Sequence, residues 1–203
     1  EDVLILEDRR ATRAALLAAL DHLAGAAGPD DVVVVYFSGH GIEGQSEPYW
    51  IPYDASWKRR EAALGAGEIH RALTSIPAAR TIAIIDTHPN DVFLALARSE
   101  PSYTLLLAAS SGENAYEVQA GAATAPHGAF TWGLLQALRR DDAPELPARR
   151  ILQLALDELG RQGFRPGQVP GFSQAGRIQT PLLVGGDDQA LFQGLPRLAE
   201  MFR

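Results

Sequence analysis

A histidine held between two glycines is the first group in this sequence that could carry chemistry. His40 lies in the segment Ser38-Gly39-His40-Gly41, directly after an apolar run at 32–37. A Gly-His-Gly turn at a strand end exposes the imidazole and lets backbone N–H groups approach a ligand, as a general base beside an oxyanion site requires. A second interpretation stays open, in which His40 is a turn residue that makes local hydrogen bonds.

Carboxylates and a second histidine follow two further apolar runs. Asp86 and His88 come directly after the run at 81–85, and Glu113 and Glu117 follow the run at 103–107. In open parallel sheets, sites form beyond the carboxyl ends of the strands. We therefore expect these side chains and His40 at one end of a sheet.

The elements that must position these residues alternate between strands and helices, which predicts an α/β domain with a mainly parallel central sheet and helices on both faces. The strands are solid apolar runs, typical of strands covered on both faces. Thr12 is expected to cap the first helix, and Pro181 to place the last strand at a sheet edge. The predicted strands cover 3–6, 32–37, 49–52, 81–85, 103–107 and 180–184, and the predicted helices cover 13–27, 68–75, 91–98, 128–140 and 148–162.

Length and charge favour one soluble domain. The 203 residues suffice for a single core, and the net charge of −7 argues against nucleic acid as a partner. No apolar run approaches the ~18 residues of a membrane span, so we expect no membrane partner and a cytoplasmic location. Residues 1–185 are predicted to form the domain, and residues 186–203 a linker or tail.

The sequence contains no cysteine, which excludes disulfides, thiolate zinc sites and a cysteine nucleophile within these residues. His40, Asp86 and His88 form a minor alternative, a metal site of two histidines and one carboxylate, but nothing supplies the surrounding hydrogen-bond pattern that such sites need. We expect no metal and no cofactor. Acidic pairs such as Asp141-Asp142 are too generic to assign to calcium, which is left open.

The sequence motifs around these residues resemble those of the caspase-like cysteine peptidases, most of all those of their prokaryotic metacaspase and orthocaspase branch. The resemblance extends over nearly the whole chain and implies a caspase-like three-layer sandwich and an endopeptidase with a Cys–His dyad. The motifs that carry it are Val-Tyr-Phe-Ser-Gly-His-Gly at 35–41, Ile-Ile-Asp at 84–86, Leu-Ala-Ala-Ser-Ser-Gly-Glu-Asn-Ala-Tyr-Glu at 107–117 and Gly-Ala-Phe-Thr at 128–131.

The resemblance implies a role for each candidate residue. The family's turn histidine is the general base, and the next glycine helps to form the oxyanion hole, which assigns these roles to His40 and Gly41. Asp86 would line the pocket for the side chain before the cleaved bond, with Glu113 and Glu117 near further pocket residues. Because an acidic pocket favours Arg or Lys, cleavage after basic residues is expected.

The sequence departs from the family pattern at the nucleophile. The family motif Asp-x-Cys-His-Ser-Gly reads here Asp-Thr-His-Pro-Asn-Asp at 86–91, so His88 stands where the cysteine is expected. An imidazole cannot replace a thiolate in forming a stable acyl-enzyme at a peptide carbonyl. The family's opening strand and helix are also missing before Glu1.

Two explanations of these departures stay open. Either the chain is a natural pseudo-protease, which predicts a peptide- or partner-binding module, or a segment with Cys-His-Ser-Gly stands between Thr87 and His88 in a longer protein, which predicts an endopeptidase. Both imply a protein or peptide as ligand. Both also fit a larger signalling, cell-death or defence protein, with sensor or scaffold domains in the same or a partner chain.

Overall fold

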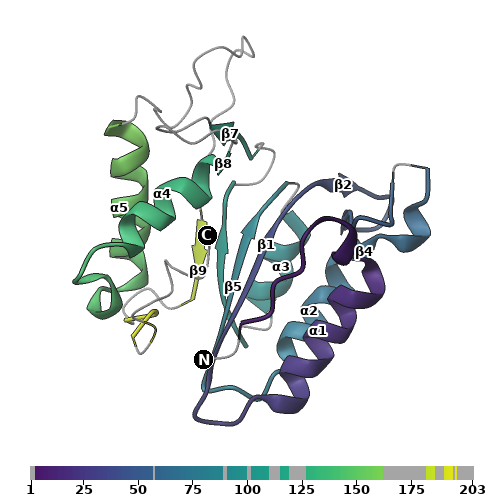
Figure 1. Cartoon of the computed structure of the whole chain (residues 1–203), viewed down its shortest axis with the longest axis horizontal. Coiled ribbons are helices and arrows are strands. Elements are labelled where there is room, and N and C mark those ends of the chain that lie inside the picture. Colours follow the sequence, from purple (N-terminus) through teal and green to yellow (C-terminus); the bar gives the residue numbers. More distant parts are fainter. Residues whose placement is uncertain are drawn as a thin grey trace.

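The central sheet of the computed structural model has four strands in the order β1-β5-β6-β9 (Figure 1). The structure describes residues 3–56, 58–88, 91–99, 102–109, 115–118, 127–161, 182–185, 190–193 and 195. β1, β5 and β6 run parallel, and β9 runs antiparallel to β6. The strands are β1 (Val32–Ser38), β5 (Arg80–Asp86), β6 (Thr104–Leu107) and β9 (Leu182–Val184).

The two strands that carry the candidate site are rich in β-branched residues, which suit a pleated and covered surface. Val32 of β1 lies opposite Arg80 of β5, and Ser38 lies opposite Asp86. Both strands therefore end at the same level, which brings the residues that follow them to one edge of the sheet.

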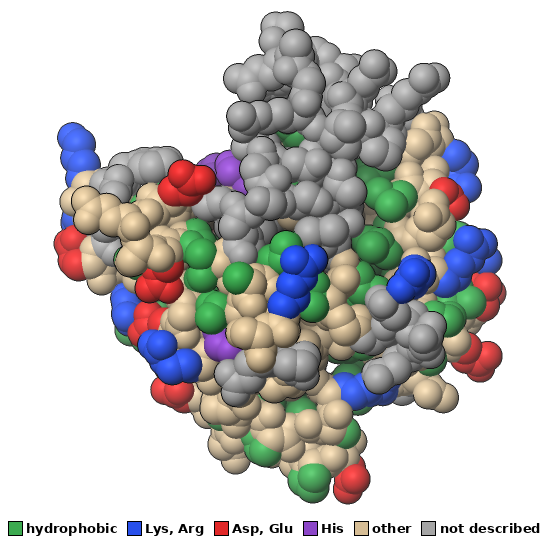
Figure 2. All heavy atoms as spheres, turned by 180° about the vertical axis from the view of Figure 1, so that it is seen from behind, with side chains coloured by type: hydrophobic (Ala, Val, Ile, Leu, Met, Phe, Trp, Pro, Cys, Tyr) green, Lys and Arg blue, Asp and Glu red, His purple; other side chains and the backbone are tan. Residues whose placement is uncertain are grey.

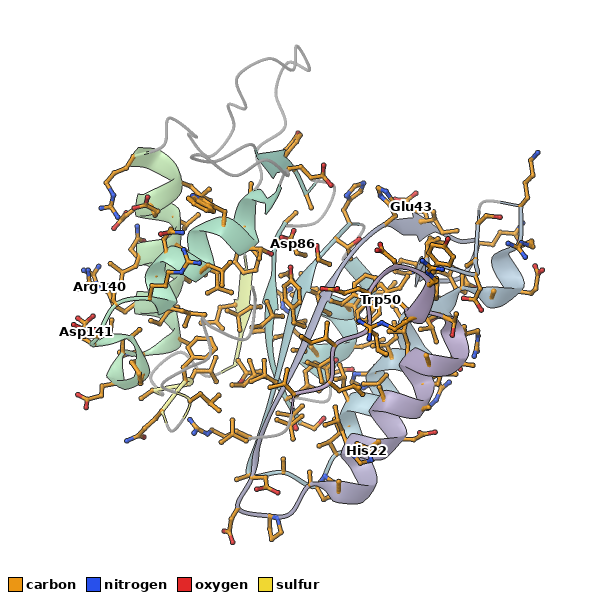
Figure 3. The ribbon with its side chains drawn as sticks, in the orientation of Figure 1. His22, Glu43, Trp50, Asp86, Arg140 and Asp141 are labelled. Atoms are coloured by element: carbon orange, nitrogen blue, oxygen red, sulfur yellow. The ribbon has the colours of Figure 1, made fainter. Side chains whose placement is uncertain are left out.

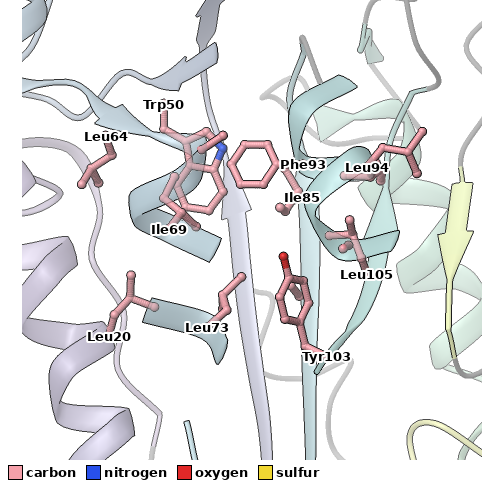
Figure 4. Close-up of a cluster of buried hydrophobic side chains, with 14 of the residues drawn as sticks. Leu20, Trp50, Leu64, Ile69, Leu73, Ile85, Phe93, Leu94, Tyr103 and Leu105 are labelled. Carbon is pink, nitrogen blue, oxygen red and sulfur yellow. The ribbon is translucent and has the colours of Figure 1, made fainter. Parts of the chain in front are cut away.

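Three helices cover one face of the sheet. They are α1 (Arg13–Ala26), α2 (Ala66–Thr74) and α3 (Asp91–Ser99). Figure 1 shows two of them, α1 and α2, on the right and the third, α3, behind the strands. Ile85 and Leu105 point from the sheet into the core on this side (Figure 4). There the Trp50 ring stacks on Phe37 with centroids 3.8 Å apart and on Phe93 with centroids 5.5 Å apart.

Two helices cover the other face. They are α4 (Ala129–Leu138) and α5 (Ala148–Arg161). Ile82, Ile84 and Leu106 alternate in sequence with the residues of the first face and pack here against Phe130. The sheet thus lies between two helical layers, and the predicted fold class, a mainly parallel sheet with helices on both faces, is confirmed.

Short elements surround this core. The small antiparallel sheet β2-β3-β4 and the pair β7-β8 both lie near the carboxyl ends of β1 and β5 (Figure 1). They are β2 (Gly41–Glu43), β3 (Pro48–Trp50), β4 (Leu64–Gly65), β7 (Glu117–Val118) and β8 (His127–Gly128), with the 3-10 turns η1 (Asp8–Arg10), η2 (Arg60–Ala62) and η3 (Ala143–Glu145).

The predicted first helix is confirmed, but the predicted strand at 3–6 is wrong. Thr12 caps α1, since its side chain accepts the N–H of Ala15 at 3.3 Å. Val3, Leu4 and Ile5 belong to no strand and are between 47% and 62% exposed. A strand needs a neighbour for its backbone hydrogen bonds, and none of the described strands pairs with this segment.

The C-terminal part of the described chain contributes to the core. Leu191 and Phe192 are fully buried on the α4 and α5 side. The guanidinium of Arg80 donates hydrogen bonds to the carbonyl oxygens of Ala190, Leu191 and Gln193 at 2.8, 3.0 and 2.7 Å. The boundary predicted at residue 186 stays a prediction, but residues 190–193 are packed.

No helix among the described residues is long and apolar enough to cross a membrane. One polar residue of α2 is buried in the core. His70 is 5% exposed, and its Nδ1 lies 2.8 Å from the hydroxyl of Tyr103.

Candidate active site

His40 follows the end of β1 in a turn that is held from both sides. The N–H of Gly39 donates to the carbonyl oxygen of Asp86 at 3.4 Å, and the carbonyl oxygen of His40 accepts the N–H of Ile51 at 3.0 Å. The His40 side chain is exposed. The turn therefore presents the imidazole to solvent at the edge of the sheet where Asp86 ends β5.

His88 lies beside His40, two residues beyond the end of β5. It is half-buried, and its Nδ1 accepts the N–H of Ala115 at a long 3.4 Å. Burial lowers the pKa of His88, and the charge of the nearby His40 lowers it further. A pKa below the ordinary 6.5 leaves the imidazole of His88 neutral at pH 7.

Gly41 brings the two strand ends into close contact. A Cβ atom at this position would collide with the carbonyl oxygen of His88 and lie 3.0 Å from its carbonyl carbon. Only glycine allows the backbone after β1 to approach the backbone after β5 so closely. This approach joins His40 and His88 into one site.

Asp86 is buried at the N-terminus of α4. Its Oδ2 accepts the backbone N–H of Thr131 at 3.2 Å and also the hydroxyl of Thr131. A Cβ at Gly128, the N-cap residue of α4, would collide with the same oxygen. Because Gly128 has no side chain to cap the helix, the carboxylate of Asp86 fills that place from the neighbouring strand. Figure 3 shows Asp86 at the end of β5, next to α4.

The charge of Asp86 depends on opposing effects. Burial raises the pKa of its carboxyl, the two hydrogen bonds from Thr131 lower it, and the charge of Glu117 raises it; the net direction is upward. The hydroxyl of Tyr36 lies 2.9 Å from Thr131 Oγ1, and burial raises the pKa of Tyr36. A chain of hydroxyl groups thus leads from β1 to the carboxyl of Asp86.

The other predicted carboxylates differ in what the structure shows of them. Glu117 is exposed on β7 and close enough for its charge to act on Asp86. Glu113 lies outside the described residues.

The face of the molecule seen in Figure 2 carries basic and acidic side chains interspersed among its described residues, and they form no patch of a single charge sign.

The minor metal-site alternative is not supported. No group of three or more His, Cys, Asp or Glu side chains within the described ranges is arranged to hold a metal ion. His40 and His88 adjoin each other, but the carboxylate of Asp86 is bound to Thr131 on α4.

Sequence reasoning missed the residues that hold Asp86. Thr131 is the last residue of the Gly-Ala-Phe-Thr motif, and Tyr36 lies within an apolar strand, but neither pattern predicts a hydrogen bond to Asp86. The available signal was Gly128 before the helix pattern, because a glycine at the N-cap has no side chain to accept the first N–H groups and leaves them to a partner from another element.

Comparison with known proteins supports the family and the fold. The family model described as the caspase domain of peptidase family C14 matches residues 3–180. The crystal structure of protein GSU0716 from Geobacter sulfurreducens matches with a TM-score of 0.61 and 18% identity, over 95% of this chain and 83% of that one, which supports the fold. A search of the curated proteins finds no match. With most of its length matched by the family model and its histidine turn at the expected edge of the sheet, this chain belongs to the caspase-domain family of peptidases.

Proposed function

We propose that this domain is a pseudo-protease, which binds extended peptides that carry a basic residue and does not cleave them. The observation that supports this proposal is His88, which stands beside His40 at the position where the family pattern expects a cysteine. Peptide cleavage by this family depends on thiolate attack and on protonation of the leaving amine by the histidine. With no cysteine in the sequence, the first of these steps has no nucleophile.

The preference for a basic residue is inferred from the carboxylates at the strand end. Asp86 and Glu117 lie close enough for their charges to interact. A guanidinium placed between two carboxylates relieves their repulsion and adds charge-assisted hydrogen bonds. An aspartate side chain would add a third negative charge, so the same site disfavours acidic peptides.

The competing function is cysteine endopeptidase activity, with His40 as base and Gly41 as part of the oxyanion hole. Family membership and the exposed His40 turn favour it. It needs a thiol that these 203 residues do not contain. The two functions share the peptide ligand and differ in whether a covalent step follows binding.

The experiment that separates them places a thiol at the nucleophile position. The wild-type chain should bind an arginine-terminated fluorescent peptide, followed by anisotropy, and should release no product from the matching fluorogenic reporter. His88→Cys should gain slow hydrolysis of that reporter, and a second change, His40→Ala, should abolish the gain. Turnover by the wild-type chain would overturn the proposal.

A matched control tests whether position matters. Thr87→Cys puts a thiol one residue away on a buried side chain and should give no hydrolysis. An aspartate-terminated peptide should bind more weakly than the arginine-terminated one; equal affinity would refute the acidic-pocket assignment. We propose no cofactor, so peptide affinity should be unchanged by a chelator of divalent cations.

The domain's partners are proposed from the same ligand chemistry. A module that holds a peptide without cutting it suits a sensor or scaffold protein, in which binding positions another chain. We infer a protein or peptide partner on this basis, in signalling or defence.

A further inference from the structure

Thr131 contacts Asp86 through both its backbone and its side chain. Its N–H donates to Oδ2 of Asp86 at 3.2 Å, and its hydroxyl donates to the same oxygen. Behind it, the hydroxyl of Tyr36 lies 2.9 Å from Thr131 Oγ1. Within the described part of the chain, these hydrogen bonds converge on Oδ2 and leave Oδ1 without one.

The hydroxyl chain can adapt to either charge state of Asp86. When the carboxyl is ionised, Tyr36 donates to Thr131, and Thr131 donates to Oδ2. When it is protonated, the direction reverses, so that the carboxyl donates to Thr131 and Thr131 donates to Tyr36. Aligned hydroxyl donors stabilise an anion more than one donor alone, because each bond polarises the next.

The surroundings of Asp86 disfavour its negative charge, so hydrogen-bond donors are needed to stabilise the carboxylate. Burial in the sheet disfavours its charged form, and the carboxylate of Glu117 on β7 repels it. The titratable groups facing this region are Tyr36 on β1, Glu117 on β7, and His88 and His40 beyond the strand ends. Neutral His88 adds no positive charge, so stabilisation of the anion comes from Thr131 and the N-terminus of α4.

We propose that Thr131 is a positioning residue for ligand recognition: it holds Oδ2 of Asp86 through its backbone N–H and its hydroxyl, favours the carboxylate over the protonated form, and leaves Oδ1 to accept from the guanidinium of a bound basic peptide. The inference rests on the proposed function for its ligand. It adds that discrimination between a charged and a neutral side chain depends on a residue of α4 behind the carboxylate.

The first test needs no ligand. Thr131→Val keeps the shape and the backbone N–H and removes only the hydroxyl, so the midpoint of the Asp86 carboxyl titration, followed by ¹³C NMR, should rise by roughly one pH unit. Thr131→Ser should restore the wild-type midpoint. Thr74→Val, which removes a hydroxyl from α2 that bonds to the His70 carbonyl, should leave the midpoint unchanged. An unchanged midpoint in Thr131→Val overturns the proposal.

The second test compares an arginine-terminated peptide with its citrulline analogue, which has the same shape and no charge. Thr131→Val should weaken binding of the arginine peptide by about tenfold near neutral pH, because the charge-assisted hydrogen bond from the guanidinium to Oδ1 of Asp86 is weakened. Binding of the citrulline peptide should be unaffected, because its side chain carries no charge. Equal losses for both peptides would show a merely structural role and overturn the proposal.

The two tests also separate this inference from the function on which it rests. If the wild-type chain binds neither peptide, the proposed function fails, while the titration still decides the role of Thr131. If Thr131→Val does not fold, Tyr36→Phe removes only the far hydroxyl and should raise the Asp86 midpoint in the same direction; no rise in Tyr36→Phe would refute the hydroxyl chain.

Discussion

At the scale of single residues, the site is governed by two groups whose charge the fold suppresses. His88 is held neutral by burial and by the neighbouring His40, and Asp86 resists ionisation because it is buried and faces Glu117. Burial is the larger cause of both shifts, and a neighbouring charge adds to it. One substitution tests each shift, and its direction follows from these causes.

Replacing His40 should raise the pKa of His88. His40→Asn removes the charge that disfavours protonation of His88, while the larger effect, burial, remains, so the midpoint should move toward the ordinary 6.5 without passing it. Proton NMR of the imidazole C–H resonances measures this directly. His22→Asn, at the far end of α1 in Figure 3, is the control and should leave the His88 titration unchanged. A downward shift in His40→Asn would contradict the inferred contact.

Asp86 should make the fold less stable as pH rises. Its pKa is higher in the folded state than the ordinary 3.8, so the folded chain holds this proton more tightly than the unfolded chain. The stabilisation is fully present below the unfolded value and is lost as pH rises through the raised folded value. Asp86→Asn, which can still accept from Thr131, should flatten this part of the pH dependence, measured by urea unfolding as the pH rises from the ordinary 3.8. An unaltered slope would show that another group is responsible.

At the scale of elements, the packing of α4 on α5 depends on a glycine. A Cβ at Gly133 would lie 2.6 Å from the carbonyl oxygen of Ala155 and 3.0 Å from Leu159. The two helices therefore approach closely along this line, and the approach also fixes the start of α4, where Thr131 meets Asp86.

Two glycine-to-alanine changes test this packing. Gly133→Ala should lower the free energy of unfolding by ~1–3 kcal/mol, because the helices must move apart. Gly160→Ala, on α5 with open space around the added methyl, should raise it by up to ~1 kcal/mol, because alanine favours the helix. Urea unfolding of both variants gives the comparison, and similar effects in the two would show that close approach is not what Gly133 provides.

The elements also show which features the sequence could predict. The runs in β1 and β5 were recognised because strands buried on both faces consist almost wholly of apolar residues. The segment 3–6 has the same composition, yet it forms no strand, because pairing is a tertiary property that composition does not contain. The polar ends of β1 and β5 could be predicted to meet, because sites form beyond the carboxyl ends of parallel strands. The contact of Thr131 with Asp86 could not be predicted, because it joins two elements that lie 45 positions apart in the sequence.

At the scale of the whole molecule, the far end of the domain is closed by residues 190–193. Phe192 is 1% exposed against the α4 and α5 side, and Arg80 binds three carbonyl oxygens of this turn. The sequence pattern predicts a linker or tail here, yet this turn contributes to the core. The turn was missed because two apolar residues in a short polar stretch carry too little periodicity to be recognised as a core segment.

Truncating Phe192 should destabilise the entire domain. Phe192→Ala should cost ~3–5 kcal/mol of unfolding free energy, as expected for a fully buried phenylalanine. Gln193→Ala is the matched control, because its side chain is exposed and Arg80 binds only its backbone carbonyl. Denaturant unfolding monitored by circular dichroism decides between the two, and a Phe192→Ala effect as small as the control's would show that the turn is dispensable.

Arg80 and Asp86 are the first and last residues of β5, so the turn held by Arg80 and the histidine pair lie ~20 Å apart, at opposite rims of the sheet. The chain has no native thiol, so Gln193→Cys would provide a unique attachment point for a dye or a sensor surface. A protein tethered there would present His40 and His88 outward, away from its support.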